Sequence, residues 1–389
     1  STDQAEVFVN SSAAGGLRMT VHGLTRGMTA RAAHEAALGA GGIVKLVTAG
    51  PIGDYDLADI RAIDPNVILL AGGVDYGDQD IVLGIAERLA TSGLTAPIVY
   101  AGNVAIRRQV RDIFAGAGLE LIISANVFPE VDVLDVAPLR AIVHDVFNRH
   151  IIHAPGMARL AGLSSWSILP TPGAVLEGAE LFADAVGDCV VVDVGGATTD
   201  VHSVTDGTPE WTSRTIDPEP RAKRTVEGDL GVFVNAEHVA GLAGGDAGAA
   251  GLEHLRAVPT TQEQHDLTRR LCRCAVQTSL SRHAGVVTDL YTPTGRKHIV
   301  RGKDLTGVRW VVGTGGALTR VPGGEAILRS ICTGAGKHLL PEPGARILID
   351  RDYRFSALGT LAQAYPDEVK ATLRSWVHST GQPIVNDSE

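Results

Sequence analysis

The stretch that decides the fold is Val190-Val-Val-Asp-Val-Gly-Gly-Ala-Thr-Thr-Asp-Val201. Its β-branched residues predict a buried strand ending at Asp193, and Gly195 and Gly196 then predict a tight turn. Backbone N–H groups and the hydroxyls of Thr198 and Thr199 can approach phosphate oxygens there, because glycine lacks the Cβ that would hold a ligand away. An Asp at a strand tip can hold a water of a magnesium shell or orient an attacking water. The stretch therefore predicts a phosphate-binding turn; a Gly-Gly pair that only makes a turn is the alternative.

A second glycine turn follows a strand-like run about 120 residues later, in Trp310-Val-Val-Gly-Thr-Gly-Gly-Ala-Leu-Thr-Arg-Val-Pro322. Gly313, Gly315 and Gly316 would let a flat ligand such as adenosine lie against the backbone. One glycine turn is a weak signal. Together, the two turns predict a nucleotide site.

The composition indicates a globular protein without a polyanionic partner. The chain has 389 residues, 44% hydrophobic residues, 4% aromatic residues and a net charge of −10. This charge argues against nucleic acid, because neutralising phosphates requires a basic surface. No apolar run reaches the roughly 18 residues of a membrane span. We therefore expect a cytoplasmic protein that binds neither nucleic acid nor membrane, with its four cysteines as reduced thiols.

From about residue 42 to 127 the chain alternates apolar runs with helical patterns, which predicts βαβ units on a parallel sheet. The predicted strands are Ile43–Val47, Val67–Leu70, Ile98–Tyr100 and Leu121–Ile123, and the predicted helices are Asp56–Ile63, Asp80–Ala90 and Ile106–Ala115. Each strand ends in small or amide residues at the sheet edge where ligands and partner loops tend to lie. A long helix is predicted from Thr261 to His283.

With its two glycine turns, the sequence resembles the superfamily of actin, heat-shock ATPases and sugar kinases. Val190–Val201 is similar to the second phosphate motif of that superfamily, and Val311–Pro322 to its adenosine motif. Glu227-Gly-Asp-Leu-Gly231 is similar to the loop that follows the phosphate hairpin in heat-shock ATPases, which adds Gly228 and Asp229 to the expected site. Arg282 ends a helix whose counterpart carries basic residues beside the adenosine. The resemblance implies an α/β fold: actin-like (ribonuclease H-like) ATPase lobes with an inserted parallel α/β domain.

A closer resemblance covers nearly the whole chain. The motifs that carry it are Ser11–Met19, Leu69-Leu-Ala-Gly-Gly-Val-Asp75, Pro97-Ile-Val-Tyr-Ala-Gly-Asn103, Lys223–Gly231, Arg282-His-Ala-Gly285, Gly302-Lys-Asp-Leu-Thr306 and Leu348-Ile-Asp-Arg-Asp-Tyr353. They resemble the GlmL/MutL accessory proteins encoded with glutamate mutase and other adenosylcobalamin-dependent mutases. This resemblance implies an ATP-dependent reactivase that exchanges damaged cobalamin on the mutase. The mutase subunits are the expected partners, and a homo-oligomer is possible.

Members of that family begin with a strand and a Gly-Ser-Thr-type turn that forms a first phosphate motif. This sequence opens with Ser-Thr-Asp-Gln-Ala-Glu instead, so the first motif is expected to be missing. A truncated chain, one part of a split protein and a form without hydrolysis are the three explanations. The expected domains are a remnant of the N-terminal ATPase lobe (1–20), the inserted α/β domain (21–150) and an ATPase lobe with both nucleotide motifs (151–389).

The expected roles follow from these motifs. Asp193 organises Mg²⁺ and water, while Gly195, Gly196, Thr198 and Thr199 contact the phosphates of ATP or ADP. Asp200 and Glu227 are the two candidates for orienting the attacking water. Gly313, Gly315, Gly316 and Thr319 flank the adenosine. Two other functions stay open: a non-hydrolysing scaffold of the mutase, and a small-molecule kinase of the same fold.

Overall fold

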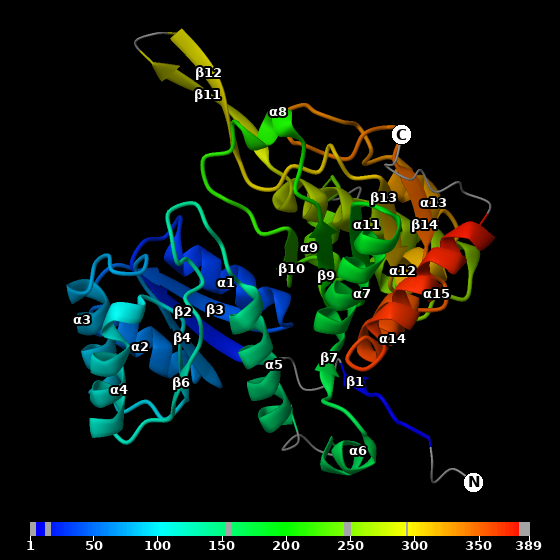
Figure 1. Ribbon diagram of the computed structural model, residues 1–389. Helices are drawn as coiled ribbons and strands as arrows, with labels where there is room; N and C mark the ends of the chain where they lie inside the picture. Colours follow the sequence, from blue (N-terminus) through cyan, green and yellow to red (C-terminus); the bar gives the residue numbers. More distant parts are fainter. Residues whose placement is uncertain (1–4, 12–16, 152–156, 245–249, 293–294, 381–389) are drawn as a thin grey trace. The chain divides into compact units, whose positions relative to one another are not determined.

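The computed structural model describes residues 5–11, 17–151, 157–244, 250–292 and 295–380 (Figure 1). The chain divides into two compact units, unit 1 from Ser1 to Gly173 and unit 2 from Ala174 to Glu389. A domain boundary was expected after residue 150, whereas this division assigns residues 151–173 to the first unit. Each unit has its own sheet and its own helices.

The sheet of unit 1 has five parallel strands in the order β3-β2-β4-β5-β6. These are β2 (Arg18–Gly23), β3 (Ile43–Ala49), β4 (Val67–Ala71), β5 (Ile98–Tyr100) and β6 (Leu121–Ile123). Four of them match the predicted apolar runs, which confirms the parallel sheet. The strand β2 was not predicted, and it lies in the sheet with Met19 and Val21 fully buried. The predicted remnant of an ATPase lobe at residues 1–20 thus overlaps the start of this strand.

Helices cover both faces of the unit 1 sheet, as expected when every strand connection is a crossover. One face packs against α1 (Thr29–Gly39), α5 (Ala137–Ile151) and α6 (Met157–Leu163). The other packs against α2 (Asp54–Ile63), α3 (Asp80–Ala90) and α4 (Arg107–Gly116), which follows the turn η3 (Val104–Ile106). The α1 helix starts very close to β2, since a Cβ on Gly23 would lie 2.6 Å from the backbone nitrogen of Ala30.

A buried histidine lies on β2, between β3 and β4. His22 on β2 is fully buried, and its ring nitrogens lie 2.8 Å from the hydroxyl of Thr48 and 3.0 Å from that of Thr20. Burial lowers the pKa of His22 to about 4, because the imidazolium would lose its hydration there. The ring is therefore neutral at physiological pH.

Polar side chains brace the loops at the carboxyl edge of the unit 1 sheet. The amide of Asn126 donates to the Asp75 carboxylate (2.8 Å) and to the Gly73 carbonyl (3.1 Å). Asn103 accepts from the backbone N–H of Tyr76 at 2.9 Å. These hydrogen bonds satisfy the backbone groups of turns that carry no regular structure. The amide residues predicted to mark this edge are thus bonded to its own loops.

Two short parallel strands of unit 1 form a separate pair: β1 (Asn10–Ser11) pairs with β7 (Leu169–Pro170). Residues 12–16 of the N-terminal motif lie outside the described residues. The described part of the chain contains no group of three or more His, Cys, Asp or Glu side chains placed to hold a metal ion.

The sheet of unit 2 has five strands in the order β10-β9-β8-β13-β14. The first three form an antiparallel meander, and β13 and β14 continue the sheet in parallel with β8. Their bounds are β8 (Cys189–Val194), β9 (Thr199–Val204), β10 (Ala222–Glu227), β13 (Trp310–Thr314) and β14 (Arg346–Ile349). The connection between β9 and β10 contains the short helix α8 (Pro209–Thr212).

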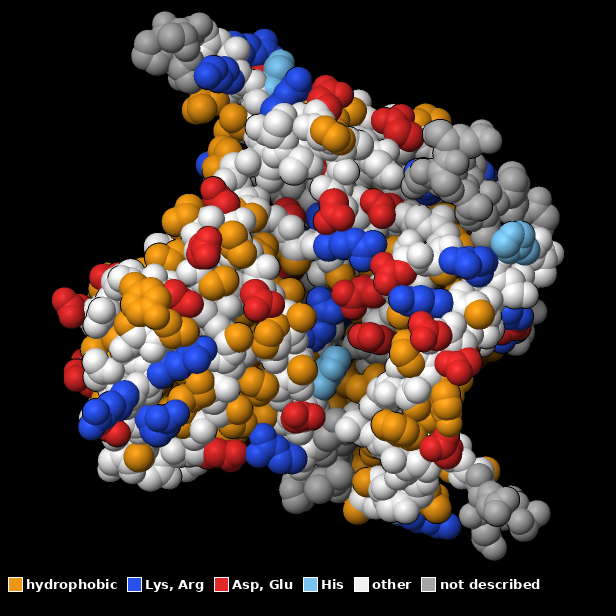
Figure 2. Space-filling view, viewed as in Figure 1, with side chains coloured by type: hydrophobic (Ala, Val, Ile, Leu, Met, Phe, Trp, Pro, Cys, Tyr) orange, Lys and Arg blue, Asp and Glu red, His pale blue; other side chains and the backbone are white. Residues whose placement is uncertain are grey.

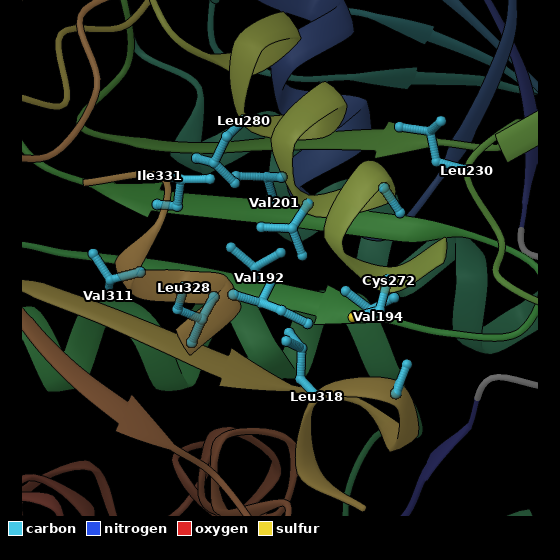
Figure 3. Close-up of a cluster of buried hydrophobic side chains, with 14 of the residues drawn as sticks. Val192, Val194, Val201, Leu230, Cys272, Leu280, Val311, Leu318, Leu328 and Ile331 are labelled. Atoms are coloured by element: carbon cyan, nitrogen blue, oxygen red, sulfur yellow. The ribbon is translucent and has the colours of Figure 1, made fainter. Parts of the chain in front are cut away.

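Helices also cover both faces of the unit 2 sheet. On one face lie α9 (Ala236–Leu242), α11 (Gln262–His283), α12 (Gly316–Thr319) and α13 (Gly324–Arg329), and Figure 3 shows Val192, Val194 and Val201 of the sheet beneath them. On the other lie α7 (Thr171–Val186), α14 (Arg354–Leu361) and α15 (Pro366–Ser379) around Trp310 and Phe355. Each fully buried Val or Leu side chain contributes about 1.5–3 kcal/mol.

The predicted long helix is confirmed as α11, which begins after Thr261. The Thr261 hydroxyl accepts from the Gln264 N–H, and the Gln264 side chain accepts from the Thr261 N–H, which closes a capping box. The apolar side chains of Leu267, Leu271 and Leu280 on this helix are buried. Cys272 is fully buried, whereas Cys274 is only partly buried.

The remaining elements of unit 2 are the short turn η4 (Leu252–His254) and a hairpin of β11 (Val286–Thr292) and β12 (Gly295–Arg301), which extends from the body of the unit (Figure 1). All four cysteines are free thiols, as expected. Among the helices in the described ranges, none combines the length and apolar character needed to cross a bilayer.

Candidate functional site

The first glycine turn connects two antiparallel strands of the unit 2 sheet. Gly195 donates to the Thr198 carbonyl at 2.9 Å, which closes the turn between β8 and β9. The segment after β10 holds it from outside, because the N–H groups of Phe233 and Val234 donate to the Gly196 carbonyl at 2.9 and 2.7 Å. A Cβ on Gly231 would lie 2.2 Å from the carbonyl carbon of Ala197, so only glycine fits at that contact.

The second glycine turn lies directly beside Asp193. Strands β8 and β13 are parallel neighbours, and Thr314 pairs with Asp193 in their register. Gly315 follows with a φ of 81°, and a Cβ there would lie 2.4 Å from both Asp193 Oδ1 and the Val194 carbonyl oxygen. A side chain at position 315 would therefore displace the Asp193 carboxylate. The structure thus brings the two predicted turns together at one edge of the sheet.

A cavity of about 270 Å³ opens between the two turns. Of the predicted residues, Gly195, Gly196 and Gly316 line it. The rest of the lining consists of residues that the sequence analysis did not single out for the site: Val194, Val232, Phe233, Arg256, Ala257, Val258, Pro259, Thr268, Ala317, Arg320, Val321 and Tyr353. Backbone, aromatic and cationic groups thus meet beside the glycine turns, as suits a flat ligand with an anionic tail.

Arg320 and Tyr353 are the most informative of the residues missed from sequence. The Arg320 guanidinium lies 5.8 Å from the centre of the Tyr353 ring. The Tyr353 hydroxyl lies 3.4 Å from the Thr319 hydroxyl, which itself donates to the Gly315 carbonyl at 2.8 Å. Tyr353 has a φ of 55°, which is unusual for a bulky residue. The Leu348–Tyr353 motif contained this tyrosine, but its sequence gave no sign that the ring turns toward the glycines.

Asp193, at the end of β8, is one of three neighbouring carboxylates, together with Asp200 and Asp350. It faces Asp200 directly across the β8–β9 pair. Burial, the Asp200 charge and the more distant Asp350 raise the pKa of Asp193 to about 7, against the opposing effect of Arg224. Asp193 nonetheless keeps part of its surface accessible. Asp193 itself does not line the cavity, but the next residues, Val194, Gly195 and Gly196, do.

Asp200 is held by an arginine and a threonine. Its Oδ1 accepts from Arg224 Nη2 at 2.6 Å and from Nε at 2.9 Å, and both side chains are almost completely buried. Its Oδ2 accepts from the Thr198 hydroxyl at 3.1 Å. Asp200, one of the two candidates for orienting water, is therefore fixed in an ion pair, and Thr198 is bonded to it.

The other candidate, Glu227, belongs to a cluster around Arg282. Arg282 Nη1 donates to Glu227 Oε2 at 2.6 Å and to Asp229 Oδ1 at 2.8 Å, and Nη2 donates to Asp229 Oδ2 at 2.9 Å. These hydrogen bonds hold the pKa of Asp229 below its usual value and raise that of Arg282. Arg282 was expected beside the adenosine, whereas here it ties the loop after β10 to the end of α11.

Thr199 and Gly313, which were also predicted for the site, pack within the fold of unit 2. The Thr199 hydroxyl is buried and donates to the Leu230 carbonyl at 2.8 Å. Gly313 packs against Leu328 and Leu318, which leave no room for a Cβ. Asn235, a residue not predicted for the site, donates to the carbonyls of Ala197 (2.8 Å) and Gly228 (2.9 Å) and so joins the phosphate-type turn to the Gly228 loop.

Comparison with known proteins decides the family. Residues 1–377 match the family model described as MutL protein. The chain belongs to the MutL protein family. A curated member, Protein MutL of Clostridium tetanomorphum, is 36% identical over 392 aligned positions, which cover 94% of this chain and 85% of the relative. This result confirms the family resemblance found in the sequence motifs.

Among solved structures, a likeness was found to a nucleotide-free acetone carboxylase, titled "Mechanism of ATP-Dependent Acetone Carboxylation". The TM-score is 0.33 at 13% sequence identity. The match covers 90% of this chain and 59% of the carboxylase chain, so this MutL family member spans less than two thirds of that protein.

Proposed function

We propose that unit 2 binds ATP with Mg²⁺ in the cavity between the two glycine turns. The observation that carries this proposal is the placement of Gly315 against Asp193, with Gly195, Gly196 and Gly316 lining one cavity. The two turns are far apart in sequence, but they place exposed backbone and the Asp193 carboxylate at the same edge of the sheet. Phosphates favour such backbone, and Mg²⁺ favours carboxylate oxygens.

The donor chemistry fits Mg²⁺. Both carboxylate oxygens of Asp200 and both of Asp350 already accept hydrogen bonds. Within the described part of the chain, the Asp193 carboxylate accepts no hydrogen bond. Mg²⁺ usually takes one or two carboxylates and completes its shell with water and substrate phosphates. Asp193 would hold the ion directly or through water. When bound, the ion would neutralise charge on the phosphates.

The cavity also suits the nucleoside. Gly316 exposes backbone at the start of α12, while Arg320 and Tyr353 offer a cation and a ring face. Stacking on aromatic or guanidinium planes is a common mode of base recognition. We infer a lobe of the actin, heat-shock ATPase and sugar-kinase type, and the meander of three antiparallel strands followed by two parallel strands supports this inference.

We propose further that ATP binding and hydrolysis reactivate an adenosylcobalamin-dependent mutase. Membership of the MutL family supports this role. Unit 1 would carry the nucleotide-dependent change to the mutase, which would exchange damaged cobalamin for intact coenzyme. Because a ligand shifts an equilibrium only by its differential affinity for two states, the chain should bind the mutase differently in ATP and in ADP.

The experiment is calorimetric titration of ATP and Mg²⁺ into the wild-type chain, Asp193→Ala and the control Asp188→Ala at the opposite end of β8. We expect Asp193→Ala to lose at least about tenfold in affinity, equal to about 1.4 kcal/mol, and the control to bind normally. Unchanged affinity of Asp193→Ala would refute the site. Release of free phosphate without transfer to alcohols or acids would separate an ATPase from a kinase.

A non-hydrolysing scaffold is the second candidate. Its support is that both candidates for orienting water, Asp200 and Glu227, are held in ion pairs with arginines. Mutase reactivation assayed with Asp193→Ala decides between the two. Full reactivation by this variant would favour the scaffold, and loss of reactivation would favour coupling to ATP.

A further inference from the structure

The hairpin of β11 and β12 is attached to unit 2 only near its base (Figure 1). There the Val287 N–H donates to the Lys337 carbonyl at 2.9 Å, and the Ile216 N–H donates to the Val300 carbonyl at 3.1 Å. Farther out, the two strands pair with each other. A two-stranded hairpin alone in water is at best marginally stable. The part of the hairpin beyond this anchor therefore gains stability only if a second surface packs on it.

The strand register separates the hairpin into two faces, because alternate side chains point to opposite sides. On the first face, Asp289 is directly opposite His298 and diagonal to Arg296. Asp289 forms ion-pair contacts with Arg296 at 2.8 Å and with His298 at 2.9 Å. The cationic groups of this face are therefore compensated within the hairpin.

The second face, here the Leu290 face, has no such compensation. Its register pairs are Val286–Arg301, Thr288–Ile299 and Leu290–Lys297. Leu290 is 45% exposed, and Lys297 and Arg301 are exposed and form no ion pair within the described ranges. Figure 2 shows the basic side chains gathered on this projecting element. Leu290 lies directly opposite Lys297, and Arg301 lies farther along the same face, opposite Val286. An exposed apolar side chain on a face with uncompensated cations suits a contact surface, where apolar contact gives affinity and charge gives orientation.

We propose that the Leu290 face binds an acidic surface of a partner protein, namely the adenosylcobalamin-dependent mutase. This inference rests on the proposed function and adds the contact surface. The partner's patch must be acidic, because Lys297 and Arg301 lack carboxylates of their own. The acidic patch of the partner must also be small. Because the whole chain carries a net charge of −10, the protein around the hairpin would repel an extended polyanion such as DNA or an anionic membrane.

The test uses two double variants of β12. Each variant removes two basic side chains, and the two variants alter opposite faces of the strand. Lys297→Gln/Arg301→Gln alters the Leu290 face, and Arg296→Gln/His298→Gln is the matched control. Each full chain is titrated with the purified adenosylcobalamin-dependent mutase of the same host, with duplex DNA and phosphatidylserine vesicles as parallel probes. Circular dichroism and ATP affinity confirm that each variant is folded.

We expect the Leu290-face variant to bind the mutase about tenfold more weakly at 0.15 M salt, with the difference shrinking as salt rises, and the control to stay within about twofold. Equal mutase binding by the two double variants would overturn the Leu290 face and leave the proposed function intact. Binding of DNA or vesicles in place of the mutase would also overturn it. If the wild-type chain binds no mutase in ATP or ADP, the proposed function fails and this inference fails with it.

Discussion

Gly315 offers the sharpest test of the site, since its neighbour Gly316 provides a built-in control. Replacing Gly315 by Ala should destabilise unit 2 and move Asp193. The φ of 81° and ψ of 153° at Gly315 belong to a region that is essentially restricted to glycine, which costs about 1–3 kcal/mol for alanine. The new Cβ would also lie 2.4 Å from Asp193 Oδ1 and from the Val194 carbonyl oxygen, and relieving such overpacking costs about 1–3 kcal/mol more.

The total for Gly315→Ala is about 2–6 kcal/mol, a large part of a typical folding free energy. For a domain of this size class each kcal/mol lowers Tm by about 2–4 °C, so scanning calorimetry should show a drop of at least about 4 °C. Affinity for ATP with Mg²⁺ should fall with it, because the displaced carboxylate is the proposed metal ligand. Calorimetric titration of the folded variant at low temperature would measure this fall.

Gly316→Ala should leave Tm unchanged or slightly higher. A Cβ at position 316 would meet no atom within 4 Å, and alanine at a compatible helical position stabilises by about 0.4–1 kcal/mol. Because Gly316 lines the cavity, its variant should still bind nucleotide less well. If Gly315→Ala matches the wild type in both Tm and nucleotide affinity, the close contact between the two turns does not exist in solution.

Three further predictions concern the charges of both units. Asp200→Asn should cost about 3–5 kcal/mol in urea denaturation, because it removes the charged carboxylate that accepts two hydrogen bonds from the buried Arg224 guanidinium; a loss below about 1 kcal/mol would contradict the buried ion pair. Arg282→Gln should cost only about 1 kcal/mol or less, since its contacts are substantially exposed, while an NMR titration should find the pKa of Asp229 back near its usual value, and an unmoved pKa would argue against the contact. The buried neutral His22 has a folded pKa of about 4 against 6.5 unfolded, so its contribution to stability is complete above pH 6.5 and is lost as the pH falls, by about 1.4 kcal/mol per unit down to about pH 4. Urea denaturation of His22→Gln at pH 7, 6 and 5 should show a shallower decline than the wild type, and parallel declines would refute this assignment.

Local patterns in the sequence were enough to find most of the unit 1 sheet and the two glycine turns. Runs such as Val67–Leu70 and Ile98–Tyr100 are short, apolar and β-branched, and they are followed by turn residues that end them. The β2 strand escaped because its residues, Arg-Met-Thr-Val-His-Gly, include polar groups. Their burial depends on partners such as Thr48 on the neighbouring strand, which no local pattern reveals.

The site was predictable where it depends on backbone and unpredictable where it depends on tertiary contacts. Glycines at 195, 196, 315 and 316 mark turns by their own chemistry. Arg224 was not singled out in sequence and Arg282 was expected beside the adenosine, and only the fold shows that these arginines hold Asp200, Glu227 and Asp229. The segment 256–259 lines the cavity without any motif, because it is an irregular connection placed there by η4 and α11.

The register of β8 and β13 has a consequence for how such proteins can diverge. Since Thr314 and Asp193 are held side by side by adjacent strands, the geometry of the two turns is independent of how many residues separate them along the chain. Loops and the projecting hairpin that do not contact the turns can lengthen or shorten in that interval without moving them. A search for relatives should therefore look for the two motifs with a freely variable spacer, and engineered insertions between Val204 and Trp310 that spare the cavity lining should leave the pairing of these strands intact.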